Sequence, residues 1–150
     1  MEMETQKLVI TSPAYNNEGA IPEKYTCDGE GINPPFEIER LPENTVTLAM
    51  IAEDPDAPNG TFMHWVVWNM DAVNSIKENS KPGISGKNGA GRTGYYAPCP
   101  PDGTHRYFFY VYALDTDLNL PGNADKMLLQ RAMRGHILAQ GKIMGHYTRK

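Results

Sequence analysis

Two histidines, each close to a proline-rich loop, are the residues of this chain best suited to binding chemistry. The segment Asp54-Pro-Asp-Ala-Pro58 precedes His64, and Pro98-Cys-Pro-Pro101 precedes His105 and Tyr107. Proline fixes its own φ angle and holds the residue before it extended, so both loops are stiff. Histidine brings hydrogen-bond donors and a charge that titrates near neutrality, and tyrosine brings a neutral donor. If the loops converge, a carboxylate, two imidazoles and a phenol share one pocket, which suits an anionic or phosphorylated ligand.

The spacing of these residues predicts a role for each. Asp54 directly follows a strand-like segment, so its carboxylate lies at a strand end. His105 and Tyr107 are two residues apart on a predicted strand, so their side chains leave the same face about 7 Å apart, while Arg106 points the other way. We expect the two histidines to donate to an anion and Tyr107 to donate from the wall. Asp54 would orient an imidazole or accept from a cationic end of the ligand, whereas Asp56 would cap its turn or pair with an arginine.

Other chemistries for the same residues stay open. A single histidine on a strand is often structural. Two aspartates and two histidines could hold a metal, although no spacing such as His-x-x-x-His is present. Cys99 beside a histidine could act as a nucleophile, although prolines flank it and no helix N-terminus favours the thiolate. The glycine-rich segment 83–94 lacks the Lys-[Ser/Thr] of a phosphate-binding loop.

A strand-rich domain is predicted to position these residues. Five segments have the alternation or the β-branched and aromatic content of strands: Leu8–Ile10, Thr45–Glu53, His64–Met70, Arg106–Leu114 and Lys142–Tyr147. Alternation along the third segment places His64 on the face of Trp68 and opposite Trp65. The fourth segment is apolar on both faces, so it is predicted to lie inside a sheet that is covered on both sides.

One helix is predicted, with an N-cap at Asn123 or Asp125 and an end at Gly141. Its apolar face follows the helical repeat through Leu129, Ala132, Met133, His136 and Ile137. His136 is therefore predicted to be a core residue, and His146 to be exposed. Segment 78–94 holds five glycines and few apolar residues, so it is predicted to be a long surface loop within the domain.

Composition predicts one domain over residues 1–150. The chain is 40% apolar and has a net charge of −4, which argues against non-specific binding to nucleic acid or to an anionic membrane. No segment approaches the length of an apolar membrane span, and no secretory signal is evident at the N-terminus, so a cytoplasmic location is predicted. In a reducing cytosol Cys27 and Cys99 are expected to be free thiols; because both lie in loops near the predicted pocket, a bridge between them is also conceivable.

Three motifs in this order closely resemble the phosphatidylethanolamine-binding protein family, also known as Raf-kinase-inhibitor-like proteins, in its compact bacterial and archaeal branch. The motifs are Asp54-Pro-Asp-Ala-Pro58, Thr61-Phe-Met-His-Trp65 with Trp68-Asn69, and Pro98-Cys-Pro-Pro-Asp-Gly-Thr-His-Arg-Tyr107. The resemblance implies a mainly β fold: an antiparallel β-sandwich with Greek-key connections and a few short helices, one of them near the C-terminus. It also implies a surface cavity for phosphate-like anions, formed by Asp54, His64, His105 and Tyr107 and walled by Ala57, Pro58, Phe62, Cys99, Pro100 and Pro101.

The resemblance implies binding and regulation rather than catalysis, with no cofactor. Some members inhibit kinases or proteases, so an alternative function is inhibition of a serine protease or kinase through the exposed loop 78–94. A metal-assisted hydrolase is a further alternative, and a homodimer is plausible by analogy with the family. The chain departs from the family pattern at Tyr96 and Ala97, where glycines are common, which predicts a narrower pocket mouth and a smaller ligand. Asn33 replaces a common serine, Ile38 replaces a common tryptophan, and the C-terminal helix of longer members has no counterpart.

Overall fold

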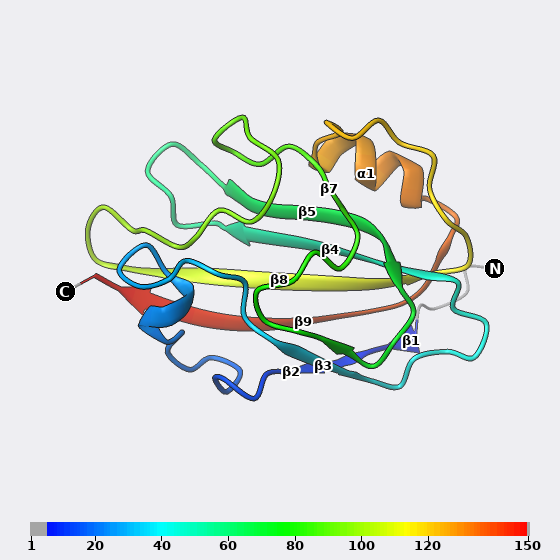
Figure 1. Cartoon of the computed structure of the whole chain (residues 1–150), viewed down its shortest axis with the longest axis horizontal. Coiled ribbons are helices and arrows are strands. Elements are labelled where there is room, and N and C mark those ends of the chain that lie inside the picture. The colour runs from blue at the N-terminus through cyan, green and yellow to red at the C-terminus, as the bar shows by residue number, and fades with distance from the viewer. Residues whose placement is uncertain (1–5, 150) are drawn as a thin grey trace.

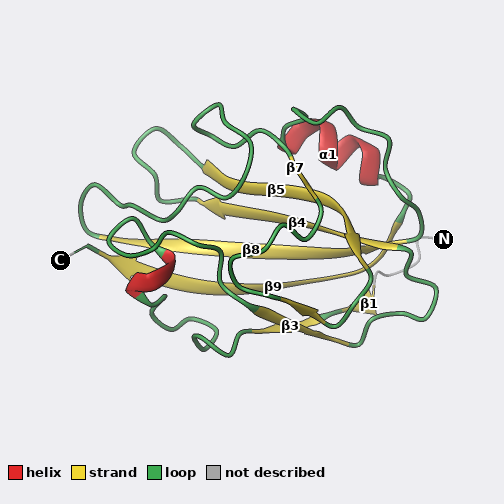
Figure 2. Ribbon diagram, in the orientation of Figure 1, coloured by secondary structure: helices red, strands yellow, loops and turns green. Residues whose placement is uncertain are grey.

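The computed structural model describes residues 6–149, which form two β-sheets, one α-helix and a short 3-10 helix (Figures 1 and 2). The large sheet has the strand order β1 (Gln6–Lys7), β9 (Ile137–Thr148), β8 (Thr104–Leu114), β4 (Thr47–Asp54), β5 (Phe62–Asp71) and β7 (Ile84–Ser85). The small sheet has the order β2 (Val9–Thr11), β3 (Phe36–Glu39) and β6 (Ser75–Ile76). The α-helix α1 spans Lys126–Met133, and the 3-10 helix spans Glu23–Tyr25.

The fold is the predicted antiparallel β-sandwich with Greek-key connections. The small sheet packs on one face of the large sheet around a core that includes Phe36, Met50 and Phe109. On the other face, α1 packs through Leu129 against Trp68; Figure 1 shows the small sheet and the helix on opposite sides of the long strands. After β5, the chain returns through a long connection, and β8 pairs with β4 on the side away from β5. Strands β4, β5, β8 and β9 therefore lie side by side and antiparallel.

A β-bulge in β5 changes the predicted face of His64. Ala52 pairs with Trp65 whereas Glu53 pairs with Met63, so His64 is the extra residue in β5. His64 and Trp65 therefore both point toward the inner face, where Trp65 joins the main core. The predicted placement of His64 on the face of Trp68 is wrong, because a bulge interrupts strand alternation. Bulges of this kind re-aim single side chains, and here the re-aimed side chain is an imidazole.

Strand β8 is central in the large sheet, but only one of its faces is fully covered. Phe109 on the inner face is buried, while Phe108, Tyr110 and Tyr112 on the outer face are half-buried. The prediction that both sides are covered is wrong along most of the strand, since α1 contacts β5 and leaves the outer face of β8 partly open. Arg106 lies over the Phe108 ring at 5.6 Å and shields part of it from water.

Helix α1 is shorter than predicted. The Asp125 side chain accepts from the backbone N–H of Leu128 at 3.0 Å, which confirms the predicted N-cap, but the helix ends at Met133. Gly135 has φ +80° and turns the chain into β9, which begins at Ile137. His136 is consequently not a core residue: its Nδ1 lies 2.8 Å from an Asp115 carboxylate oxygen, and both side chains are partly exposed. In the described part of the chain, no helix has the length and apolar character needed to cross a bilayer.

His146 is half-buried, not exposed as predicted. Its backbone N–H donates to the carbonyl of Gly19, and its carbonyl accepts from Ile21. The segment around Ala20 thus runs alongside β9, and this edge contact covers part of the histidine.

Segment 78–94 is anchored to the large sheet and is not a free surface loop. It contains β7, which pairs with β5, and the Gly86 N–H donates to the Val66 carbonyl at 2.7 Å. A Cβ at Gly86 would lie 2.1 Å from the Ala124 carbonyl oxygen and 2.6 Å from the Trp68 ring. Asn88 in the same segment is buried. The glycines that suggested flexibility are there in part because the backbone approaches its neighbours closely.

Cys27 and Cys99 form a disulfide, so the expectation of free thiols is wrong. The loops that carry them lie side by side: the Cys27 N–H donates to the Pro98 carbonyl at 3.0 Å, and the Tyr95 hydroxyl donates to the Tyr25 carbonyl at 2.9 Å. These contacts hold the two sulfur atoms within bonding reach. The bridge joins residues that are 72 positions apart in the sequence.

Substitution of Gly86 tests whether segment 78–94 is packed on the sheet. Gly86→Ala is expected to lower the free energy of unfolding by about 1–3 kcal/mol, because its methyl group would meet backbone and indole atoms. Gly122→Ala is the matched control, since nothing lies within 4 Å of a Cβ at Gly122. Urea denaturation of both variants measures the difference. Equal stability of the two variants would contradict the packing described for this segment.

Loss of the disulfide is expected to destabilise the protein. A bridge that closes a loop of this length removes conformational entropy from the unfolded chain worth about 4 kcal/mol. Thermal melts with and without a reductant should therefore differ by many degrees, and the double variant Cys27→Ser, Cys99→Ser should melt at the lower temperature in both conditions. A wild-type melting temperature that does not respond to reductant, after mass spectrometry has confirmed reduction, would show that the bridge contributes nothing.

Candidate functional site

A cavity of about 260 Å³ opens where β4 ends and where β5 and β8 begin. It is lined by Asp54, Ala57, Pro58, Phe62, His64, Tyr96, Cys99, Pro100, Pro101, His105 and Tyr107. All ten residues predicted for the pocket are in this set, together with Tyr96, which was not predicted. We call this cavity the imidazole pocket. Strands β5, β4 and β8 are antiparallel neighbours, so the end of β4 lies beside the starts of β5 and β8. The cavity therefore brings together loops that are distant in the sequence.

Asp54 holds the imidazole of His105. One carboxylate oxygen, Oδ2, lies 2.6 Å from Nδ1 of His105, and both side chains are buried. The other oxygen, Oδ1, accepts from the backbone N–H of Asp56 at 2.7 Å. Both carboxylate oxygens are therefore occupied by protein donors. This geometry matches the predicted role of Asp54 in orienting an imidazole.

Asp56 fixes the same loop to the opposite face of β8. Its carboxylate accepts from Nε and Nη2 of Arg106, each at 2.9 Å, and from the Arg106 backbone N–H at 2.9 Å. The hydrogen bonds from Arg106 are the main reason that the pKa of Asp56 falls to about 2. The predicted pairing of Asp56 with an arginine is confirmed. Asp54 and Asp56 thus bind His105 and Arg106, two consecutive residues of β8 whose side chains lie on opposite faces of the sheet.

The second imidazole is held by backbone. Nδ1 of His64 lies 2.6 Å from the carbonyl oxygen of Tyr96, and the Tyr96 N–H donates to the His64 carbonyl at 2.8 Å. Since a carbonyl only accepts, Nδ1 of His64 carries the proton. Burial lowers the pKa of His64, although the Tyr96 carbonyl and the Asp54 charge act in the opposite direction. His64 is thereby kept mainly neutral around physiological pH.

In both imidazoles, the Nε2 atom has no protein partner within residues 6–149 and is available to a ligand. Among the described residues no protein group hydrogen-bonds Nε2 of His64 or of His105, and neither atom is sealed from solvent. The two rings flank Tyr107: the His64 ring is edge-on to it at 5.2 Å, and the His105 ring is stacked with it at 6.5 Å. Both Nε2 atoms are therefore available to a ligand in the cavity that the two rings line.

Tyr107 contributes a wall and not a hydrogen-bond donor. Its ring lines the imidazole pocket, but its hydroxyl is fully buried and has no hydrogen-bond partner among the described residues. Burial also raises the pKa of this hydroxyl. The predicted donation from Tyr107 to an anion does not fit this placement, because the hydroxyl is sealed from solvent. Position along the strand correctly predicted the face of Tyr107 but not the depth its hydroxyl reaches.

The remaining wall is apolar and uncharged. Phe62 contacts His64 edge-on at 4.9 Å and Tyr96 at 5.4 Å, and prolines and the disulfide form the opposite side. No lysine or arginine of residues 6–149 lines the pocket, and Arg106 points to the other face of β8. Among the described lining residues, Asp54 is the only carboxylate and the imidazoles are the only groups that can carry a positive charge.

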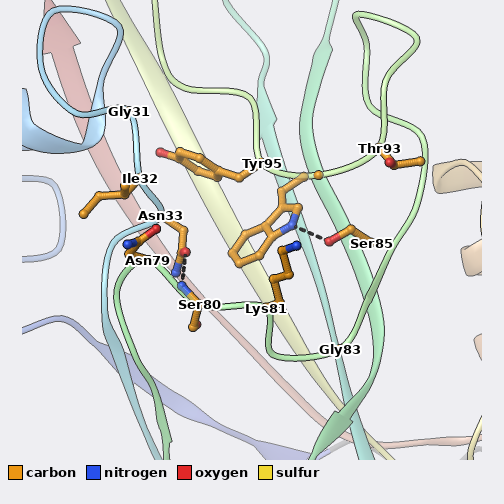
Figure 3. Close-up of a pocket in the computed structure, with 12 residues that line it drawn as sticks. Gly31, Ile32, Asn33, Asn79, Ser80, Lys81, Gly83, Ser85, Thr93 and Tyr95 are labelled. Atoms are coloured by element: carbon orange, nitrogen blue, oxygen red, sulfur yellow. Dashed lines mark hydrogen bonds between the residues drawn. The ribbon is translucent and has the colours of Figure 1, made fainter.

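A second cavity of about 500 Å³ lies between segments 31–33, 79–85 and 93–95 (Figure 3). Two hydrogen bonds join residues of its lining: the backbone N–H of Ser80 donates to Oδ1 of Asn33, and Nε1 of Trp65 donates to the Ser85 hydroxyl, as the dashed lines show. Within the described part of the chain, Lys81 is its one charged lining residue. The absence of imidazole and carboxylate groups from its lining makes it a weaker candidate for anion chemistry than the imidazole pocket.

The geometry bears on two alternative chemistries. Within residues 6–149, no group of three or more histidine, cysteine, aspartate or glutamate side chains is arranged to hold a metal ion, and both oxygens of Asp54 are already occupied by protein donors. Cys99 is bonded to Cys27, so in this state it has no thiol to act as a nucleophile.

Tyr96 is the site residue that the sequence interpretation missed. Its backbone orients His64, and its exposed ring lies at the rim of the pocket. The signal was present in the sequence, since Tyr96 replaces a residue that is commonly glycine in the family. That departure was interpreted only as a narrowing of the pocket mouth. The contact with His64 is made by a backbone carbonyl, which every residue has, so the residue type does not indicate it.

Comparison with known proteins agrees with this fold. The phosphatidylethanolamine-binding protein family matches residues 11–148. A UPF0098 protein of Pyrococcus horikoshii is 48% identical and aligns with 98% of this chain and 79% of its own length. A UPF0098 protein of Archaeoglobus fulgidus is 46% identical over 99% of this chain, and the chain spans 54% of that relative's length.

Two solved structures share the architecture over nearly the whole chain. A protein of Chlamydia trachomatis, described as a putative phosphatidylethanolamine-binding protein homologue, superposes with a TM-score of 0.93 at 39% identity and covers 97% of this chain and 100% of its own. A protein of Escherichia coli, described as a new member of the mammalian family, has a TM-score of 0.86 at 25% identity and covers 96% and 99%. The chain therefore belongs to the phosphatidylethanolamine-binding protein family, in its bacterial and archaeal branch.

Proposed function

We propose that this protein is a non-enzymatic binding and regulatory protein whose imidazole pocket holds a small phosphate-like anion or phosphorylated head group. Family membership supports a binding or regulatory role in general. One observation carries the proposal to this pocket: two imidazoles, each fixed through Nδ1, turn their Nε2 atoms into the same cavity. Two fixed donors of this kind can grip separate oxygens of one tetrahedral anion when the rings are protonated.

The size of the pocket favours a small ligand. Its volume of about 260 Å³ lies just below the range of roughly 300–1,000 Å³ that is common for small-molecule sites. Tyr96 stands at the rim where a glycine would leave more space, and its ring contacts Phe62 across the opening. A phosphate or phosphorylated head group fits this space, whereas the acyl chains of a phospholipid would have to remain outside.

Inhibition of a serine protease or kinase stays a prediction, as do a homodimer and a cytoplasmic location. The structure changes how the first should be tested. Deletion of segment 78–94 would remove β7 from the edge of the large sheet, so loss of inhibition could reflect unfolding. Exposed positions such as Lys81 and Ile84 are better targets for substitution. The disulfide bears on location, since such bridges persist in oxidising compartments and in intracellular proteins of hyperthermophiles.

Removal of the His105 imidazole is expected to weaken binding of inorganic phosphate by about ten- to a hundredfold. The reason is that a hydrogen bond to a charged group contributes roughly 1.5–3 kcal/mol. Isothermal titration calorimetry of His105→Ala with inorganic phosphate and with phosphoethanolamine measures the loss. His136→Ala is the matched control, because that imidazole also pairs with a carboxylate but lies on the surface outside the pocket.

The thermal melting transition shows whether each variant is folded before it is titrated. Unchanged phosphate affinity in folded His105→Ala would refute the role assigned to His105. Failure of the wild-type protein to bind either phosphate compound would refute the proposed function itself.

A further inference from the structure

The imidazole pocket, which we propose binds an oxyanion, has no permanent cation on its walls. Asp54 contributes a negative charge, and Arg106 is turned away and paired with Asp56. With both imidazoles neutral, the lining therefore carries one negative charge in total. Binding of an anion under these conditions requires that a proton be supplied, either by the protein or by the ligand.

The hydrogen bonds at Nδ1 determine what each ring offers the ligand. His64 donates from Nδ1 to the Tyr96 carbonyl, and His105 donates from Nδ1 to the Asp54 carboxylate. A neutral imidazole has one N–H and one lone pair, so in the neutral form each Nε2 presents a lone pair to the cavity. Nε2 becomes a donor only when the ring is protonated as well. A neutral ring in this pocket is thus an acceptor, and it repels an oxyanion that carries no proton.

Its surroundings favour the neutral form of His64. The groups that face it are Asp54 from β4, His105 and Tyr107 from β8, and the Tyr96 carbonyl from the segment before β8. Burial outweighs the two favourable contacts and lowers the pKa of His64, and the nearby His105 acts in the same direction. His105 differs because a carboxylate accepts directly from its Nδ1. The two rings are therefore suited to different tasks: His105 to donate and His64 to accept.

We infer that the imidazole pocket selects oxyanions that carry a proton, such as inorganic phosphate and the singly protonated form of a phosphate monoester, over acceptor-only oxyanions of similar shape, such as sulfate and its esters. This inference rests on the proposed function. A P–OH group donates to Nε2 of His64, and protonated His105 donates from Nε2 to an unprotonated oxygen of the same anion. Sulfate holds no proton at neutral pH, so it binds only if His64 takes one from solvent.

Calorimetric titration of the wild-type protein with inorganic phosphate and with sulfate tests the inference. At neutral pH phosphate is expected to bind at least about tenfold more tightly, since sulfate leaves a buried lone pair facing an oxygen. As the pH falls below the ordinary range of histidine, His64 becomes protonated and the affinity for sulfate should rise toward that for phosphate. Titrations in buffers with different ionisation enthalpies should show that sulfate takes up more protons than phosphate does.

His64→Gln separates this inference from simple shape selection, because a glutamine amide can donate to sulfate without taking up a proton. The variant should lose most of the preference for phosphate over sulfate, whereas the matched control His136→Gln should keep that preference. Equal wild-type affinities for phosphate and sulfate at neutral pH would overturn the inference and leave the proposed function intact. A preference that survives unchanged in folded His64→Gln would also overturn it. If the wild-type protein bound neither anion, the proposed function would fail together with the inference.

Discussion

The contact between the Asp54 carboxylate and the His105 imidazole is the interaction on which the site depends. It is short, buried and long-range, and it joins the end of β4 to the start of β8. Asp56 reinforces it by gripping Arg106 on the other face of the same strand. Each carboxylate is satisfied by protein donors, so the proline-rich loop is held in one position before any ligand arrives. Preorganisation of this kind reduces the entropy that is lost when a ligand binds.

Three other features complete the pocket around this contact. The bulge in β5 turns His64 inward beside Trp65, where regular alternation would have turned it toward α1. The Tyr96 backbone then fixes the ring of His64 and its tautomer. The Cys27–Cys99 bridge ties the second proline-rich loop to the segment next to the 3-10 helix. Each feature is local, but together they bring three strand ends and two loops to one cavity in which two imidazole nitrogens are available to a ligand.

Much of this arrangement could be predicted from residue patterns. The alternation of Thr45–Glu53 predicted β4 and its two faces, and the three motifs identified the family and the residues that line the pocket. The errors have physical causes that a residue pattern does not contain. The bulge at His64 depends on pairing with β4, and the depth of the Tyr107 hydroxyl depends on core packing. The helical repeat continued past Gly135 into residues that the fold uses for β9. The disulfide depends on loops that come together only in the folded chain.

The electrostatic character of the pocket also follows from details that the sequence does not display. An anion site was predicted from the types of its residues, and the structure adds that its only possible cations are imidazoles whose Nδ1 atoms are already engaged. Charge in the site is therefore linked to protons rather than to fixed lysine or arginine side chains. The proposed preference for oxyanions that carry a proton depends on this linkage. It requires that both neutral rings carry their proton on Nδ1.

A long-range proton–nitrogen NMR spectrum of the histidines, recorded with and without inorganic phosphate, tests the account most directly. We expect the neutral rings of His64 and His105 to carry their proton on Nδ1, and we expect phosphate to shift the Nε2 resonances of both. His136 and His146 should not respond. Protonation of neutral His64 or His105 on Nε2, or a phosphate titration that leaves both rings unchanged, would contradict the account.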